Sequence, residues 1–290
     1  MPIEYFTEGN SETSVIARME GCEDERFKRV MSAVIRHLHA AAKEVELTQE
    51  EWFQAIQFLT RTGQLCDDRR QEFILLSDTL GLSMLVDAIN HRKTGSATES
   101  TVLGPFHVAH APLREMGADI SLDGKGEPLF MSGRILNTAG QPIEGAVLDI
   151  WHSNVEGFYD VQQPDLQPGF NLRGRFTTGA DGRYWFRSTR PEFYPIPYDG
   201  TVGKMLEKMK RHPYRPAHIH FIVSAPGYAS VTTHVFPRGA KYLESDAVFG
   251  VKESLIIDFP RHDDRARAAE LGVGNPFSTA EYDFVLEDRA

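Results

Sequence analysis

The first third of the chain repeats apolar residues at a spacing that predicts amphipathic helices. Between residues 25 and 45 the apolar positions recur at steps of three and four, at Phe27, Val30, Met31, Val34, Ile35 and Leu38. This spacing places them on one face, because an α-helix completes a turn about every 3.6 residues. We therefore expect a helix with an apolar stripe over this segment.

Two further helices are expected before residue 95. Thr48 can accept from the Glu51 amide while the Glu51 side chain reaches back, which predicts a capping box at a helix start. Gly63 suits the end of this helix. A third helix is expected over residues 71–92, and apolar residues on more than one side predict that it is well buried. The stripe that the second helix is expected to bury consists of Trp52, Ala55, Ile56 and Leu59.

The pattern changes near Gly95, after which glycine and proline separate short runs rich in Val, Ile, Phe and Tyr. Asp181-Gly182 and Pro226-Gly227 are turn signals between such runs. Short strands without helical patterns between them favour an antiparallel β-sandwich. The predicted fold class is α+β, mainly β, with a helical segment over 1–95 and a sandwich domain over 96–290. The expected strands cover 129–136, 145–151, 182–188, 218–225, 230–236 and 253–259.

Composition narrows the class of protein. The chain has 290 residues, of which 41% are hydrophobic and 25% charged, as in ordinary globular proteins. Its net charge of −10 argues against a nucleic-acid partner. Cys22 and Cys66 form no disulfide framework, the N-terminus lacks the apolar core of a signal peptide, and no run of about 18 apolar residues predicts a membrane span. We expect a cytoplasmic protein.

His218 and His220 are the strongest candidates for metal ligands. They are two apart on an expected strand, so both imidazoles point to one face. The same pair occurs in zinc hydrolases, in cupins and as ordinary strand histidines. Tyr159 follows another expected strand, and Tyr194 lies in a proline-rich loop. Deprotonated tyrosines are hard oxygen donors that favour ferric iron over softer or divalent metals.

The stretch from residue 131 to residue 159, MSGRILNTAGQPIEGAVLDIWHSNVEGFY, resembles the signature region of intradiol ring-cleavage dioxygenases. The later Tyr-Pro-Ile-Pro and Arg-Pro-Ala-His-Ile-His segments resemble the family's other ligand segments, and the resemblance covers roughly residues 20–260. It implies one Fe(III) per chain, with Tyr194 and His220 as axial ligands and Tyr159 and His218 as equatorial ligands.

The same resemblance implies the reaction and two catalytic residues. Both atoms of O2 are inserted as the ring of a small aromatic diol or triol opens between its adjacent hydroxylated carbons. Tyr194 is expected to double as the general base, and Arg215 to stabilise negative charge on the ring. The helical segment is expected to form a homodimer interface, with a lipid as a further expected ligand there.

The substrate pocket is also assigned by resemblance. Leu103-Gly104-Pro105-Phe106 and the segment 245–252 are more similar to hydroxyquinol 1,2-dioxygenases than to catechol-specific members. Hydroxyquinol is therefore the expected substrate, with catechol or a chlorocatechol as the alternative. The third hydroxyl of hydroxyquinol needs a polar partner, for which Asp78 is the acidic candidate. The expected pocket residues are Leu75, Asp78, Val102, Leu103, Gly104, Pro105, Phe106, Ile196, Pro197 and Val248.

Two other interpretations remain open from the sequence. A cupin also uses His-x-His and a later histidine, for which His234 is available, but no Glu lies between His220 and His234. A cupin also leaves the tyrosines unexplained. The segment 140–151 resembles prealbumin-like modules that bind ligands without catalysis. His234 stands where catechol-cleaving relatives commonly carry Gln, and we expect it beside the ligands rather than among them.

Overall fold

The computed structural model describes residues 5–68, 70–93 and 95–289. The chain divides into two units, Met1–Gln64 and Leu65–Ala290. The helices over residues 72–90, which the sequence pattern groups with the N-terminal segment, fall in the second unit. Among the described residues, no helix has both the length and the apolar character that a membrane span requires.

The first unit contains the helices α1 (Ser11–Ala17), α2 (Glu25–Glu44) and α3 (Gln49–Gln64). Asp24 caps α2 by accepting from the Phe27 amide at 2.8 Å. The capping box predicted for α3 is confirmed: the Thr48 amide donates to Glu51 at 3.0 Å, and the Glu51 amide donates to Thr48 Oγ1 at 3.2 Å. The helix continues through Gly63, so the stop expected there is one residue early.

The apolar faces of α2 and α3 lie exposed, which corrects the expectation of a buried stripe. In α3, Trp52, Ile56 and Leu59 are among the exposed large apolar side chains. In α2, Phe27 and Leu38 are exposed as well. Within this unit α1 packs against α2. The helices are amphipathic as predicted, but no described residue of this unit covers their apolar faces.

The third expected helix is two helices in the structure, α4 (Glu72–Thr79) and α5 (Leu82–Asn90). The break falls at Gly81, whose φ of 77° lies in the left-handed region that glycine tolerates. Phe73 of α4 and Leu82 and Leu85 of α5 are exposed, so the prediction that this segment is well buried was wrong for its outer face. Its inner face lines the cavity described below.

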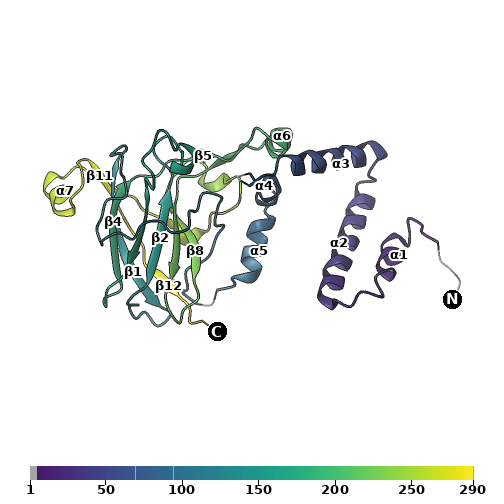
Figure 1. The fold of residues 1–290 in the computed structure, drawn as a ribbon, viewed down its shortest axis with the longest axis horizontal. Helices are drawn as coiled ribbons and strands as arrows, with labels where there is room; N and C mark the ends of the chain where they lie inside the picture. The colour runs from purple at the N-terminus through teal and green to yellow at the C-terminus, as the bar shows by residue number, and fades with distance from the viewer. Residues whose placement is uncertain (1–4, 69, 94, 290) are drawn as a thin grey trace. The chain divides into compact units, whose positions relative to one another are not determined.

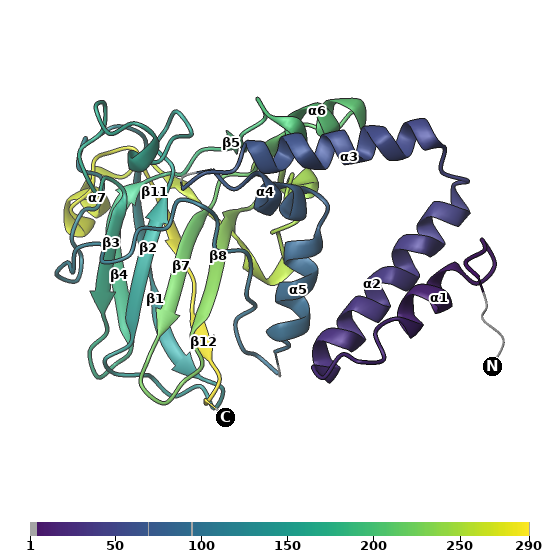
Figure 2. The same ribbon diagram turned by 45° about the vertical axis from the view of Figure 1, so that its right-hand side comes forward.

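Two five-stranded sheets form the β-sandwich of the second unit (Figures 1 and 2). One sheet contains β1 (Pro128–Asn137), β4 (Arg183–Thr189), β10 (Arg261–His262), β11 (Phe277–Glu281) and β12 (Phe284–Leu286). The other contains β2 (Val147–His152), β3 (Arg173–Thr177), β7 (Ile219–Ser224), β8 (Val231–Pro237) and β9 (Ile256–Ile257).

Short elements complete this unit. The two-residue strands β5 (Tyr194–Pro195) and β6 (Tyr214–Arg215) pair with each other outside the sandwich. The remaining helices are η1 (Asp160–Gln162), α6 (Thr201–Lys208), η2 (Leu243–Ser245), η3 (Glu253–Leu255) and α7 (Arg265–Leu271).

A single apolar core fills the space between the sheets. Leu129 and Met131 of β1, Ile150 of β2, and Phe221 of β7 belong to it, and each is fully buried. Burying one such side chain contributes roughly 1.5–3 kcal/mol. Alternate residues of each strand enter this core, so the residues between them point away from it.

The predicted α+β class is confirmed, with one difference in strand direction. β2, β3, β7 and β8 pair antiparallel, as expected. β1 instead pairs parallel with both β11 and β12 along one edge, and β8 pairs parallel with β9. Parallel neighbours need a long connection, and the strands β11 and β12 come from the far end of the chain. No local turn signal could show this pairing.

Candidate metal centre and substrate cavity

The four expected ligand residues come from three separate elements of the second unit. Ile219 and Phe221 point into the sandwich core, so His218 and His220 point to the opposite face of the sheet. Tyr194 lies on β5, directly opposite Arg215 of β6. Tyr159 follows β2 and caps the short helix η1. All four side chains are buried.

The donor atoms of these side chains converge on one point. Tyr159 Oη lies 2.9 Å from His220 Nε2 and 3.5 Å from Tyr194 Oη. His218 Nε2 and His220 Nε2 are 3.1 Å apart. Two phenol oxygens and two imidazole nitrogens thus meet without any intervening apolar group, which is the arrangement that a metal ion with oxygen and nitrogen ligands requires.

The protonation states suit such an ion. His218 Nδ1 lies 2.7 Å from the Pro216 carbonyl oxygen and donates to it, so the lone pair is on Nε2. Burial, and then the Arg215 charge, lower the pKa of His218 well below its usual value. Burial also lowers the pKa of His220, so both imidazoles are neutral and can offer a nitrogen lone pair to a metal ion. Burial raises the pKa of Tyr159 well above its usual value, so only a strongly charged cation would hold it as a phenolate.

A row of rings in register supports His220. Trp151, His220 and His234 are direct neighbours across β2, β7 and β8. The Trp151 ring stacks on His220 with centroids 4.6 Å apart and planes at 12°. His234 packs edge to face on His220 at 4.1 Å and stacks on His218 at 4.7 Å. Nitrogens of His218, His220 and His234 all lie within 4.8 Å of one another, so the three histidines form a second possible ligand set.

Aromatic and charged groups fix the Tyr159 ring. Phe106 stacks on it with centroids 4.5 Å apart. The Arg173 guanidinium lies 6.0 Å from the ring centroid, and Asp160 accepts from Arg173 Nε at 2.6 Å. Arg173 and Asp160 are themselves buried. The ring therefore has little freedom to rotate.

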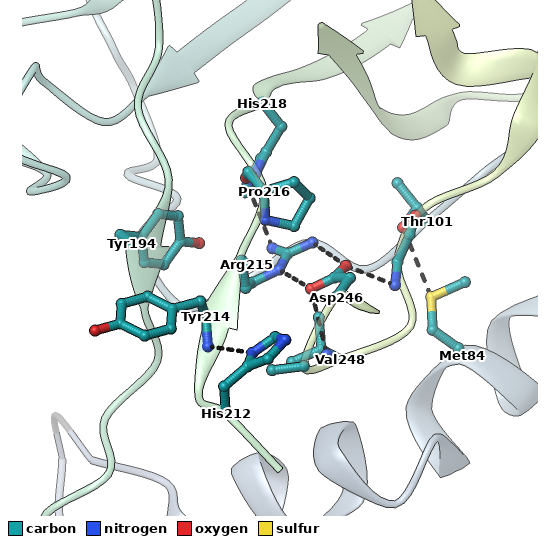
Figure 3. Close-up of polar contacts among 12 residues, drawn as sticks. Met84, Thr101, Tyr194, His212, Tyr214, Arg215, Pro216, His218, Asp246 and Val248 are labelled. Carbon is teal, nitrogen blue, oxygen red and sulfur yellow. Dashed lines mark hydrogen bonds and ion pairs between the residues drawn. The ribbon is translucent and has the colours of Figure 1, made fainter. Parts of the chain in front are cut away.

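Arg215 lies next to the candidate ligand His218 and has a buried acidic partner (Figure 3). Its Nη1 donates to His218 Nε2 at 3.3 Å, while Nε donates to Asp246 at 3.1 Å. Burial by itself lowers the pKa of Arg215, but the Asp246 carboxylate outweighs burial and the pKa lies above its usual value. Arg215 is thus a permanent cation beside the converging donor atoms.

A cavity of about 1000 Å³ opens onto this point. It lies within the second unit, and Tyr194 and Arg215 form part of its wall. Every residue expected in the substrate pocket lines it: Leu75, Asp78, Val102, Leu103, Gly104, Pro105, Phe106, Ile196, Pro197 and Val248. Gly104 permits a close approach, because a Cβ there would lie 3.2 Å from the His220 ring.

Asp78 is a half-buried acidic residue of the cavity wall. Burial raises its pKa above the usual value, while Ser83 and the Arg215 charge oppose that rise and Asp246 adds to it. The charged neighbours show that Asp78 is close to the Arg215–Asp246 pair. A carboxyl group in this position can pair with a polar substituent on a bound ring.

Comparison with known families accounts for this geometry. The family model for the catechol dioxygenase N terminus matches residues 24–98, and the model for the dioxygenase domain matches residues 102–288. The chain belongs to the intradiol ring-cleavage dioxygenases. Enzymes of this family use a non-haem iron, and the dioxygenase described here has a buried histidine cluster suited to one.

Several relatives of this dioxygenase are similar along their whole length. The hydroxyquinol 1,2-dioxygenase of Rhizobium sp. (strain MTP-10005) is 60% identical over 97% of this chain and 96% of its own. The 6-chlorohydroxyquinol 1,2-dioxygenase of Cupriavidus pinatubonensis is 50% identical over 90% and 95%. The solved hydroxyquinol 1,2-dioxygenase of Pseudomonas putida DLL-E4 has a TM-score of 0.92 at 48% identity, covering 97% of this chain and 99% of that one.

The structure of the dioxygenase also contains residues at the site that the sequence left unassigned. Asp246 lies in the segment 245–252 that carries the family resemblance, two residues before the expected wall residue Val248, but its pairing with Arg215 depends on the fold. Trp151 stands within the segment that carries the family resemblance, but its contact with His220 depends on strand pairing. Arg173 and Asp160 gave no signal, because a charged pair reads as exposed until its burial is known.

Proposed function

We propose that the dioxygenase cleaves hydroxyquinol (benzene-1,2,4-triol) between its two adjacent hydroxylated carbons, with insertion of both atoms of O2. The product is 3-hydroxy-cis,cis-muconate, the enol form of maleylacetate. The 60% identity to a hydroxyquinol 1,2-dioxygenase supports this substrate most directly. The cavity supports it too, because its wall combines apolar residues with the acidic Asp78.

We further propose one Fe(III) per chain, held by Tyr159, Tyr194, His218 and His220. When bound, this ion supplies the Lewis acidity that binds the two adjacent hydroxyls and prepares the ring for reaction with O2. The convergence of two phenol oxygens and two neutral imidazoles supports this ligand set over three histidines. His234 is proposed to support the His220 ring rather than to bind the ion.

The neighbouring residues then have distinct tasks. Tyr194 Oη accepts a proton from one substrate hydroxyl, which makes Tyr194 both a ligand and a general base. Arg215 Nη1 faces the same point and stabilises negative charge on the ring. Asp78 pairs with the third hydroxyl, and Val102, Ile196 and Val248 hold the apolar face of the ring.

Turnover of three substrates tests the reaction. The purified protein should cleave hydroxyquinol with a higher kcat/KM than catechol or 4-chlorocatechol, measured as O2 uptake together with product identification. A preference for catechol would replace the proposed substrate with the alternative one. Absence of ring cleavage on all three would exclude the proposed reaction.

Two variants separate the competing ligand sets. Tyr159→Phe removes one proposed phenolate, so the visible charge-transfer colour of the iron-loaded protein should be lost or strongly weakened. His234→Gln should retain both the colour and one iron per chain, since no proposed ligand is lost. The opposite pattern, a coloured Tyr159→Phe protein and an iron-free His234→Gln protein, would assign the site to the three histidines.

We also propose a homodimer formed through the helices of the N-terminal segment 1–95, with a lipid bound at that interface. The exposed apolar side chains of α2 and α3 support this, because surfaces of this kind usually pack against a partner. Sedimentation should give a dimer that Trp52→Glu dissociates, whereas the control Gln57→Glu on the other side of α3 should leave it intact. Mass spectrometry of extracts tests for the lipid.

The expected cytoplasmic location remains a prediction.

A further inference from the structure

Arg215 and Asp246 form a buried ion pair with two contacts. Arg215 Nε donates to Asp246 Oδ1 at 3.1 Å, and Nη2 donates to Oδ2 at 3.3 Å. Their side chains are only 3% and 2% exposed. This arrangement uses one edge of the guanidinium and leaves Nη1 for His218 and the cavity (Figure 3). The direction of Nη1 is therefore set by the contacts of Nε and Nη2 with Asp246.

The same carboxylate also shapes the cavity wall. The Val248 amide donates to Asp246 Oδ1 at 3.3 Å, and the Gly250 amide donates to Oδ2 at 2.9 Å. The Gly250 carbonyl in turn accepts from Thr101 Oγ1 at 2.9 Å. A Cβ at Gly250 would lie only 2.8 Å from Arg215 Nη2, so the close approach of this loop to the guanidinium requires glycine at that position.

A second arginine joins this loop to the helix that carries Asp78. Arg211 donates from Nη1 to the Thr79 carbonyl at 2.6 Å and from Nη2 to the Ala247 carbonyl at 3.0 Å. The loop 246–250 is therefore fixed on both sides. The position of the Asp246 carboxylate beside Arg215 is thereby fixed.

We propose that Asp246 is a positioning residue, which orients the Arg215 guanidinium toward the reacting ring. The proposal rests on the proposed function, in which Arg215 is the stabilising cation. Without the carboxylate, a buried guanidinium is free to turn toward any other oxygen at the site. The electrostatic stabilisation that it gives depends on a fixed direction, so loss of Asp246 weakens it although Arg215 remains.

The test is a double-mutant cycle on the iron-loaded enzyme with Asp246→Asn, Arg215→Gln and the double variant. Asp246→Asn preserves size and should lower kcat on hydroxyquinol about tenfold to a hundredfold, with a much smaller change in KM. In the Arg215→Gln background the same substitution should cost little more, because Asp246 acts through Arg215. Iron content and the visible band should stay unchanged, since no proposed ligand is altered.

Asp258→Asn is the matched control, because Asp258 forms an exposed ion pair with Arg238 at 2.8 Å. It should leave kcat unchanged. If Asp246→Asn alone does not fold, because it leaves a buried cation unpaired, the double variant removes both charges and its kcat is compared with that of Arg215→Gln. Equal values support the proposal. A wild-type kcat in Asp246→Asn, or a double variant far slower than Arg215→Gln, would overturn it. Absence of ring cleavage by the wild-type enzyme would instead contradict the proposed function.

Discussion

Tyr194 is the residue on which the proposed chemistry places two demands. Its hydroxyl lies 3.5 Å from that of Tyr159, and its strand partner is Arg215. Tyr194 lies on a two-residue strand outside the sandwich, whereas His220 lies within β7 of the central sheet.

Tyr194→Phe should therefore reduce catalysis far more than substrate affinity. It removes both a ligand and the base, and loss of general-base catalysis alone costs roughly a hundredfold to ten-thousandfold. Steady-state kcat and anaerobic substrate binding, measured on protein of known iron content, separate the two effects. An iron-loaded variant that turns over at the wild-type rate would rule out the role of Tyr194 as base.

Asp78 is the residue that we expect to set substrate preference. Asp78→Ala should lower kcat/KM on hydroxyquinol about tenfold to a hundredfold more than on catechol, because only hydroxyquinol has the hydroxyl that Asp78 pairs with. Asp78→Asn retains a hydrogen-bonding side chain and should preserve part of the preference. Equal losses on both substrates would mean that Asp78 supports only the fold.

At the scale of elements, a single glycine in β1 permits one edge of this strand to pair first with β11 and then with β12. β1 pairs first with β11 up to Ser132 and then with β12 from Ile135. Gly133 lies at the junction, where a Cβ would overlap the Tyr282 carbonyl oxygen. Glycine is needed at position 133 because the backbone of Tyr282, which lies between β11 and β12, approaches β1 closely there.

Gly133→Ala should destabilise the protein by roughly 1–3 kcal/mol, because the added methyl group forces the Tyr282 backbone away. Gly169→Ala is the matched control, since a Cβ at Gly169 meets nothing within 4 Å. Urea unfolding followed by circular dichroism measures both variants. Equal midpoints for the two would contradict the steric explanation.

For the molecule as a whole, buried histidines link stability to pH. His152 is fully buried between the Ser153 carbonyl and Ser188 Oγ, and burial lowers its pKa from 6.5 to about 4. The unfolded chain therefore binds a proton between pH 6.5 and pH 4 that the folded protein does not. Stability is complete above the unfolded pKa and is lost as the pH falls through this range.

Lowering the pH from 7 to 5 should thus cost roughly 2 kcal/mol of unfolding free energy through His152 alone. The variant His152→Gln has no imidazole to protonate, so its stability should fall less over the same interval. Urea unfolding at the two pH values, on both proteins, gives the comparison. The same pH dependence in the two proteins would show that His152 does not contribute.

The sequence by itself determined the local features of this dioxygenase. Periodicity predicted α2 and α3, and the Thr48–Glu51 capping box depends on neighbouring residues alone. Alternation along residues 218–220 predicted two imidazoles on one face, and the resemblance supplied the tyrosines. The residues expected in the pocket came from the resemblance too, since no spacing brings residues 75 and 248 together.

Only the tertiary structure decided which distant groups meet. The parallel pairing of β1 with β11, the Trp151–His220–His234 row and the Arg215–Asp246 pair all join segments remote in sequence. Whether an amphipathic face is buried also depends on what packs against it, which is why the expected α3 stripe is exposed. Burial and pairing are properties of the assembled chain, because they depend on the positions of all neighbours, whereas helix periodicity and capping depend on a few adjacent residues.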